Sequence, residues 1–215
     1  MKDIISIIWL LSIIIVIFGS IPYLIWIIKT LKKKEYKAFK KQLLYPSLFF
    51  IFLYGLTLIV NKVDRKIYLG NIFDCSISFD DPIYEYYSER SFNGDGYSFV
   101  VFELPSDIEA RFKTFDQKLK EDYPIKPDYR KEWHIINWKQ APFSQEFQDQ
   151  LNFSLSTYDA DKEMKNHFQN IRSGLSEAES YYSFFYNTPS TYIGDIDFFM
   201  VDLKRKKVYF INHNT

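Results

Sequence analysis

Two long apolar runs open the chain, and a mixed pattern of apolar and polar residues follows them. Residues 4–28 contain no charged side chain, and neither do residues 43–60. As helices, runs of this length span the roughly 30 Å hydrocarbon core of a bilayer. The pattern therefore predicts an N-terminal hairpin of two transmembrane helices within residues 1–61. The alternatives are a cleaved signal peptide for the first run and a buried core helix for the second.

The second part of the chain, residues 62–215, shows the patterns of strands and helices. Segments rich in Tyr, Phe and Val predict strands over residues 84–92, 97–104, 181–186, 195–203 and 207–211. Apolar residues at helical spacing predict helices over residues 106–120, 144–152 and 161–173. Two strands, then helices, then three strands indicate an α+β domain, an antiparallel sheet with helices on one face.

Charge is divided between these two parts, although the net charge of the whole chain is zero. Residues 29–42, between the apolar runs, hold seven Lys and one Glu, whereas residues 62–215 hold 19 basic and 25 acidic side chains. Positively charged loops stay on the cytoplasmic side of a membrane. We therefore expect a two-span protein of the cell membrane, with its lysine loop inside and residues 62–215 outside. The lipid bilayer is its first expected partner.

The segment Asn93-Gly94-Asp95-Gly96 lies between two predicted strands and is the main candidate site. Asn-Gly and Asp-Gly pairs are typical of hairpin turns, because such turns need positive φ angles. The alternative is a loop that presents Asp95 beside Arg90 and Glu103. A single carboxylate between two glycines supplies too few oxygen ligands for calcium, so we predict no metal here.

The sequence carries no recognisable catalytic or cofactor motif. Its only cysteine is Cys75, its three histidines lack metal-binding spacing, and neither a G-x-S-x-G motif nor a nucleotide-binding glycine loop is present. We therefore assign no catalytic residue and expect neither a cofactor nor a nucleic-acid partner. Aromatic side chains and Arg are favoured at protein interfaces. The candidate binding residues are accordingly Arg90, Asn93, Asp95, Tyr97, Phe99 and Glu103.

Three short segments resemble a family of small uncharacterised bacterial membrane-anchored proteins and lipoproteins. "SFNGDGYSFVVFEL" is similar to their His-Gly-Asp-Gly stretch and following strand, with Asn93 where the family often has His. "AESYYSFFYNTPS" and "DIDFFMVDLKRKKVYFINHNT" resemble their Tyr-rich segment and closing hairpin. The resemblance implies an outward-facing, membrane-tethered domain, and it implies no activity.

Three classes of function remain open at this point. The first is a tethered protein-binding module, for example an immunity-type protector against a toxin that acts outside the membrane. The second is an envelope-acting enzyme whose carboxylates come together only in the fold. The third is a sensor or an accessory subunit of a membrane complex. The absence of catalytic motifs favours the binding module.

Overall fold

A computed structural model describes most of the chain. The described residues are 11, 14, 23, 25–30, 32–33, 36–75, 79, 81–92, 95–127, 130, 132–157, 159–189 and 192–215. The chain divides into two compact units, Met1–Ile67 and Tyr68–Thr215. The predicted span at 4–28 and the candidate residue Asn93 lie wholly or largely outside the described residues.

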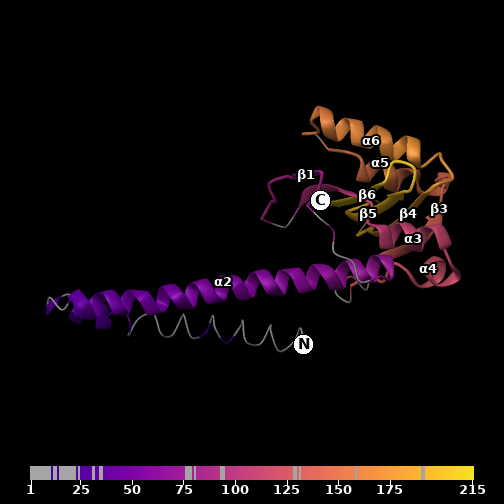
Figure 1. Cartoon of the computed structure of the whole chain (residues 1–215). Helices are drawn as coiled ribbons and strands as arrows, with labels where there is room; N and C mark the ends of the chain where they lie inside the picture. Colours follow the sequence, from indigo (N-terminus) through magenta and orange to yellow (C-terminus); the bar gives the residue numbers. More distant parts are fainter. Residues whose placement is uncertain are drawn as a thin grey trace. The chain divides into compact units, whose positions relative to one another are not determined.

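A single long helix, α2 (Tyr36–Phe73), crosses the boundary between the units (Figure 1). The second predicted span, residues 43–60, is helical throughout. Within the described residues, one helical segment, Ser47–Phe73, is long and apolar enough to cross a membrane, by length and composition alone. Several of its large apolar side chains in the first unit, such as Ile51 and Phe52, are exposed.

The second unit contains a six-stranded sheet, which confirms the predicted α+β class with an antiparallel sheet. The strand order is β1-β2-β6-β5-β4-β3, and every neighbouring pair is antiparallel. The strands are β1 (Tyr84–Tyr87), β2 (Gly96–Glu103), β3 (His134–Gln140), β4 (Ser180–Asn187), β5 (Asp195–Asp202) and β6 (Lys207–Asn214). The five predicted strands are all present.

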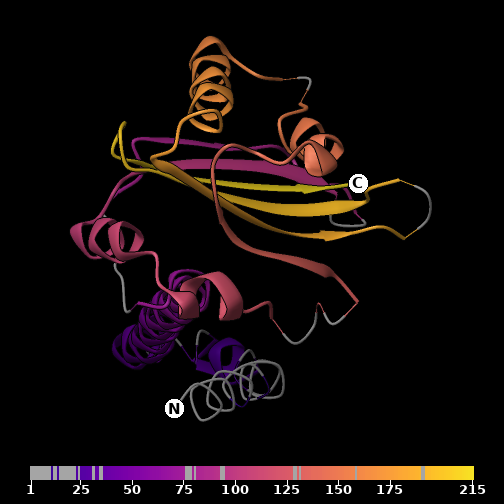
Figure 2. The same cartoon turned by 90° about the vertical axis from the view of Figure 1, so that its right-hand side faces the viewer.

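Helices cover both faces of this sheet, so the prediction of helices on one face was wrong. The two helices α5 (Gln148–Ser154) and α6 (Lys162–Gly174), with the 3-10 turn η2 (Gln145–Phe147), cover one face. The other face packs against α3 (Ser106–Thr114), α4 (Gln117–Asp122) and the last turns of α2. Figure 2 shows α5 and α6 across the sheet from α3 and α4.

The physical reason for two covered faces lies in the central strands. In β4 and β5, apolar residues occupy consecutive positions instead of alternating with polar ones. Phe184 and Phe198 therefore face α5 and α6, while Phe185 and Phe199 face the other way. A strand that is apolar on both faces requires cover on both.

The end of α2 is part of the core of the second unit. Leu69, Ile72 and Phe73 are buried there. The Ile72 carbonyl accepts a hydrogen bond from the Trp138 indole N–H at 2.8 Å, and the Asn71 carbonyl accepts one from the backbone N–H of Ile125 at 2.8 Å. Carbonyls that a helix leaves unpaired at its C-terminus are thereby satisfied.

Charged side chains hold the turn that follows α2. Asp74, in the left-handed region with φ 54°, pairs with Arg111 and Lys118, each at 2.8 Å. Burial alone would raise the pKa of the Asp74 carboxyl, but hydrogen bonds from Lys118 and Tyr123 and the nearby positive charges keep it below its usual value. The sequence did not single out this cluster.

Candidate functional site at one end of the sheet

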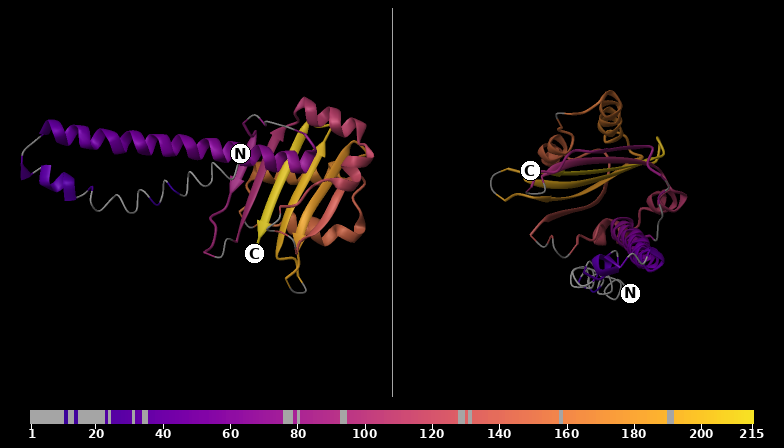
Figure 3. Two further views of the ribbon diagram at one scale, coloured as in Figure 1. Left: turned by 90° about the horizontal axis from the view of Figure 1, so that it is seen from below. Right: turned by 90° about the vertical axis from the view of Figure 1, so that its left-hand side faces the viewer.

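The strand register brings two hairpin loops and the C-terminus to the same end of the sheet. Asn214 pairs with Gly96 at the start of β2 and with Asp195 at the start of β5. The loop after β1 and the loop after β4 therefore flank the end of β6, as Figure 3 shows. We call this region the loop end, and it comprises the described residues among 87–96, 187–195 and 212–215.

A buried carboxylate organises the polar residues beside the loop end. Asp197 is only 3% exposed and forms an ion pair with Arg130. The Asn212 side-chain amide donates a hydrogen bond to Asp197 Oδ1 at 2.5 Å, and the Tyr68 hydroxyl lies 3.5 Å from Asp197 Oδ2. Arg90 in turn donates to Asn212 Oδ1 at 3.0 Å. The β1–β2 loop is thus connected to the central strands by a continuous polar network.

A second carboxylate, Asp195, lies nearer the tips of the loops. Burial raises the pKa of the Asp195 carboxyl, and the negative charge of Asp95 adds to the rise. A hydrogen bond with Asn187 and the positive charge of Arg130 act in the opposite direction. The fold therefore places the Asp95 carboxylate where its negative charge acts on the Asp195 carboxyl.

Aromatic side chains project from the same end of the molecule. Phe92 is fully exposed, and Tyr87 and Tyr192 are each 63% exposed. Large aromatic side chains are more often buried in a fold, so these three exposed side chains, from β1 and the two loops, are the least enclosed aromatic residues of the loop end. His213 is different, because its ring stacks on Phe153 at 4.2 Å and its Nδ1 lies 2.9 Å from the Phe153 carbonyl oxygen.

The structure brings some of the predicted binding residues together and separates others. Arg90 and Asp95 both lie at the loop end, where Asp95 N–H donates to Ser91 Oγ at 3.1 Å. Tyr97 and Phe99, by contrast, are buried beneath α5 and α6, so neither is available at the surface.

Tyr97 is next to the loop end but its side chain is held in the core, and Glu103 lies away from the loop end. The Tyr97 hydroxyl donates to the Ser154 carbonyl at 2.9 Å, and burial raises the pKa of Tyr97. Glu103 ends β2 at the opposite end of the sheet, where it pairs with Lys207 at 2.8 Å.

Sequence reasoning missed the residues that form the centre of this region, namely Asp195, Asp197, Asn212 and Arg130. One signal was present in the sequence. Asp195 and Asp197 are two residues apart in a strand whose remaining residues, except Asp202, are apolar, so they lie on the same face of the sheet. A carboxylate at an inward-facing strand position must find a partner, since burial of an unpaired charge is costly.

Neither a search for metal-binding groups nor comparisons with known proteins assigns a role to this region. Among the residues that the structure describes, no group of three or more His, Cys, Asp or Glu side chains is arranged to hold a metal ion. Comparisons with protein-family models, curated proteins and solved structures gave no match.

Proposed function

We propose that this protein is a membrane-tethered binding module that contacts a protein partner outside the cytoplasmic membrane. The observation that carries the proposal is the group of exposed aromatic side chains at the loop end, Tyr87, Phe92 and Tyr192, beside Arg90. Aromatic residues and Arg dominate the binding energy of protein interfaces. An immunity-type protector, which intercepts a toxin on the outer side of the membrane, is one concrete form of such a module.

The proposed tether is the two-span hairpin, of which α2 is the second helix. With 38 residues, α2 has a length of roughly 57 Å at about 1.5 Å per residue. A bilayer core takes up about 30 Å, so the remainder is long enough to reach into the folded domain. The seven Lys in residues 29–42 favour a cytoplasmic loop and hence an outer domain.

Reporter fusions test the topology. Alkaline phosphatase fused after residue 215 should be active, and the same enzyme fused at residue 38 should be inactive. Activity at residue 38 instead would mean that the lysine loop is outside and that the proposed location is wrong.

Partner binding is tested with the full chain in mild detergent. The wild-type chain and a Phe92→Ala/Tyr192→Ala variant would be used to capture cross-linked proteins from the envelope of the producing cell. The variant should lose one specific partner, because each truncation of an interface aromatic typically costs about 1–2 kcal/mol or more. Ile125→Ala, an exposed apolar change outside the loop end, is the matched control and should keep that partner.

The immunity-type form of the proposal predicts protection from a toxin in addition to partner binding. Expression of the chain should protect cells from a toxin encoded beside it, and Phe92→Ala/Tyr192→Ala should abolish protection without lowering the amount of protein. A partner that is captured equally well by the wild type and by this variant would rule out the loop end as the binding surface.

An envelope-acting enzyme is the second candidate, and one observation favours it. Asp195 has a raised pKa and shares its surroundings with Asp95, and such a pair is a common arrangement for proton transfer. Turnover of a wall or lipid substrate that Asp195→Asn stops, with the fold intact, would establish the enzyme in place of the binding module.

A further inference from the structure

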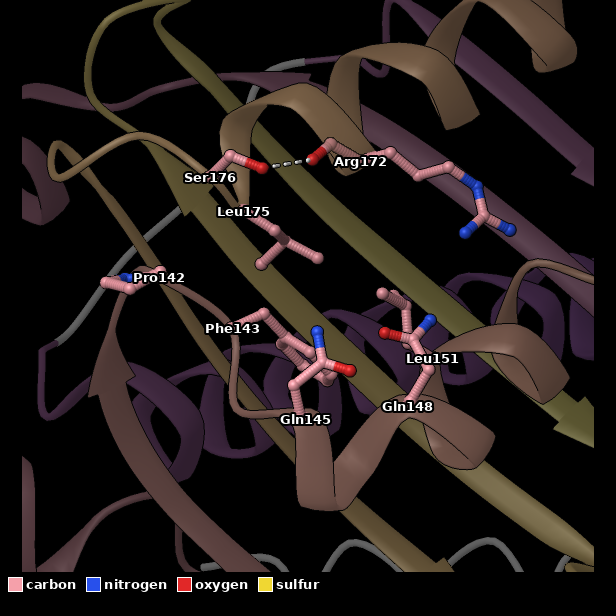
Figure 4. Close-up of a pocket in the computed structure, with 8 residues that line it drawn as sticks. All are labelled: Pro142, Phe143, Gln145, Gln148, Leu151, Arg172, Leu175 and Ser176. Atoms are coloured by element: carbon pink, nitrogen blue, oxygen red, sulfur yellow. Dashed lines mark hydrogen bonds between the residues drawn. The ribbon is translucent and has the colours of Figure 1, made fainter.

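A pocket lined by residues outside the loop end lies on the sheet face that α5 and α6 cover. It has a volume of about 310 Å³ and is partly open to solvent, and Figure 4 shows the residues that line it. Phe143, Leu151 and Leu175 form its apolar floor, and Arg172, Gln145 and Gln148 form its rim. A pocket of this size is at the lower limit of the range for ligand sites in proteins.

The shape of the pocket is set by ordered backbone contacts. Phe143 N–H donates to the Leu175 carbonyl at 2.9 Å, which fixes the segment before η2 against the end of α6. Leu151 and Leu175 are buried in the core cluster, so the floor is a continuation of the packed interior. The backbone and the leucines around the floor are therefore held in place by hydrogen bonding and packing.

The rim provides one positive charge and two amides. In the part of the chain that the structure describes, no carboxylate pairs with the Arg172 guanidinium, whereas Arg205 nearby pairs with both Glu177 and Asp202. Gln148 donates to Asn152 at 3.2 Å, which leaves its amide oxygen as an acceptor. The Gln145 amide offers both a donor and an acceptor.

We propose that this pocket is a docking site for a peptide segment that carries an aliphatic side chain next to a carboxylate. The aliphatic group contacts the floor, the carboxylate pairs with Arg172, and the peptide backbone hydrogen-bonds to the two glutamines. Charge complementarity favours an acidic segment, since Arg172 is the one charged side chain among the described residues that line the pocket.

The test uses the full chain in detergent micelles and the fluorescein-labelled peptide Gly-Ser-Leu-Glu-Ser-Gly. The comparison peptide has Gln in place of Glu. Fluorescence anisotropy, with empty micelles as the blank, should show that the protein binds the Glu peptide about tenfold more tightly than the Gln peptide. Arg172→Gln should remove this difference. Lys165→Gln is the matched control, because it removes an exposed positive charge from the same helix outside the pocket.

A second variant locates the site. Gln145→Trp, a change at an exposed rim position, should fill the hollow and abolish binding of both peptides. Equal affinities of the wild type for the two peptides, or an acidic preference that survives in Arg172→Gln, would overturn the proposal. The proposal also fails if 4-methylpentanoate displaces the labelled peptide at a lower concentration than the unlabelled peptide does, because the site would then select a small carboxylate. None of these outcomes depends on the loop end.

Discussion

Replacing Phe73 with Ala tests whether the end of α2 is an integral part of the folded domain. Phe73 is 0% exposed, and its ring lies 5.5 Å from that of Trp138, 5.7 Å from Phe210 and 6.1 Å from Phe112, between ring centroids. Truncation of a buried Phe typically costs about 3–5 kcal/mol, from lost transfer energy and from the cavity that remains. We expect Phe73→Ala to lower the free energy of unfolding by about 4 kcal/mol.

The measurement is urea unfolding of the full chain in nonionic detergent, followed by tryptophan fluorescence. With a slope of about 2 kcal/mol per molar urea, the expected loss lowers the midpoint by about 2 M. Phe92→Ala is the matched control, because it removes the same atoms from a fully exposed position and should change stability by less than about 0.5 kcal/mol.

A loss below about 1 kcal/mol for Phe73→Ala would refute the reasoning, because such a value lies far below the cost of truncating a buried Phe. The domain would then fold without the end of α2. Trp138→Phe provides a separate check on the same junction. It retains most of the ring but leaves the buried Ile72 carbonyl without the indole N–H, which should cost about 1–3 kcal/mol.

The remaining predictions concern the charged groups of the domain. Asp197→Ala should destabilise by about 3–5 kcal/mol in the same urea assay, since it leaves Arg130 without its buried carboxylate, and a loss below about 1 kcal/mol would contradict the ion pair. Glu103→Ala removes an exposed pair and should cost less than about 1 kcal/mol. Burial lowers the pKa of His167 and His213, so below about pH 6.5 the unfolded state binds more protons than the folded state. Stability should be steady above about pH 7 and fall as the pH drops below about 6.5, with a smaller fall in a His213→Gln variant.

Local pattern was enough to predict most of the elements of the domain. Strands β4, β5 and β6 follow from dense Tyr, Phe and Val, and α6 from its apolar spacing and from Asp161, whose side chain accepts the Met164 N–H at 2.7 Å. These signals are local because backbone geometry and capping act within a few residues.

Two elements were not predicted correctly from the local pattern, and the structure gives the reason for each. The edge strand β3 has only one buried residue, Trp138, so its sequence lacks the alternation that marks a strand. The helix predicted over residues 106–120 is two helices, since Phe115 adopts φ 39° and Asp116 then caps α4 by accepting the Leu119 N–H at 3.0 Å.

The sequence by itself determined the apolar N-terminal runs, the division of charge and the α+β class, since each depends on composition or on a short repeating pattern. Only the tertiary structure decided which polar groups meet. Arg130 and Asp197 are distant in sequence, yet the fold brings their side chains together as an ion pair. The tertiary structure also decided that Tyr97 and Phe99 are core residues and that Phe73 belongs to the folded domain. Burial depends on what packs against a residue, and no local pattern contains that information.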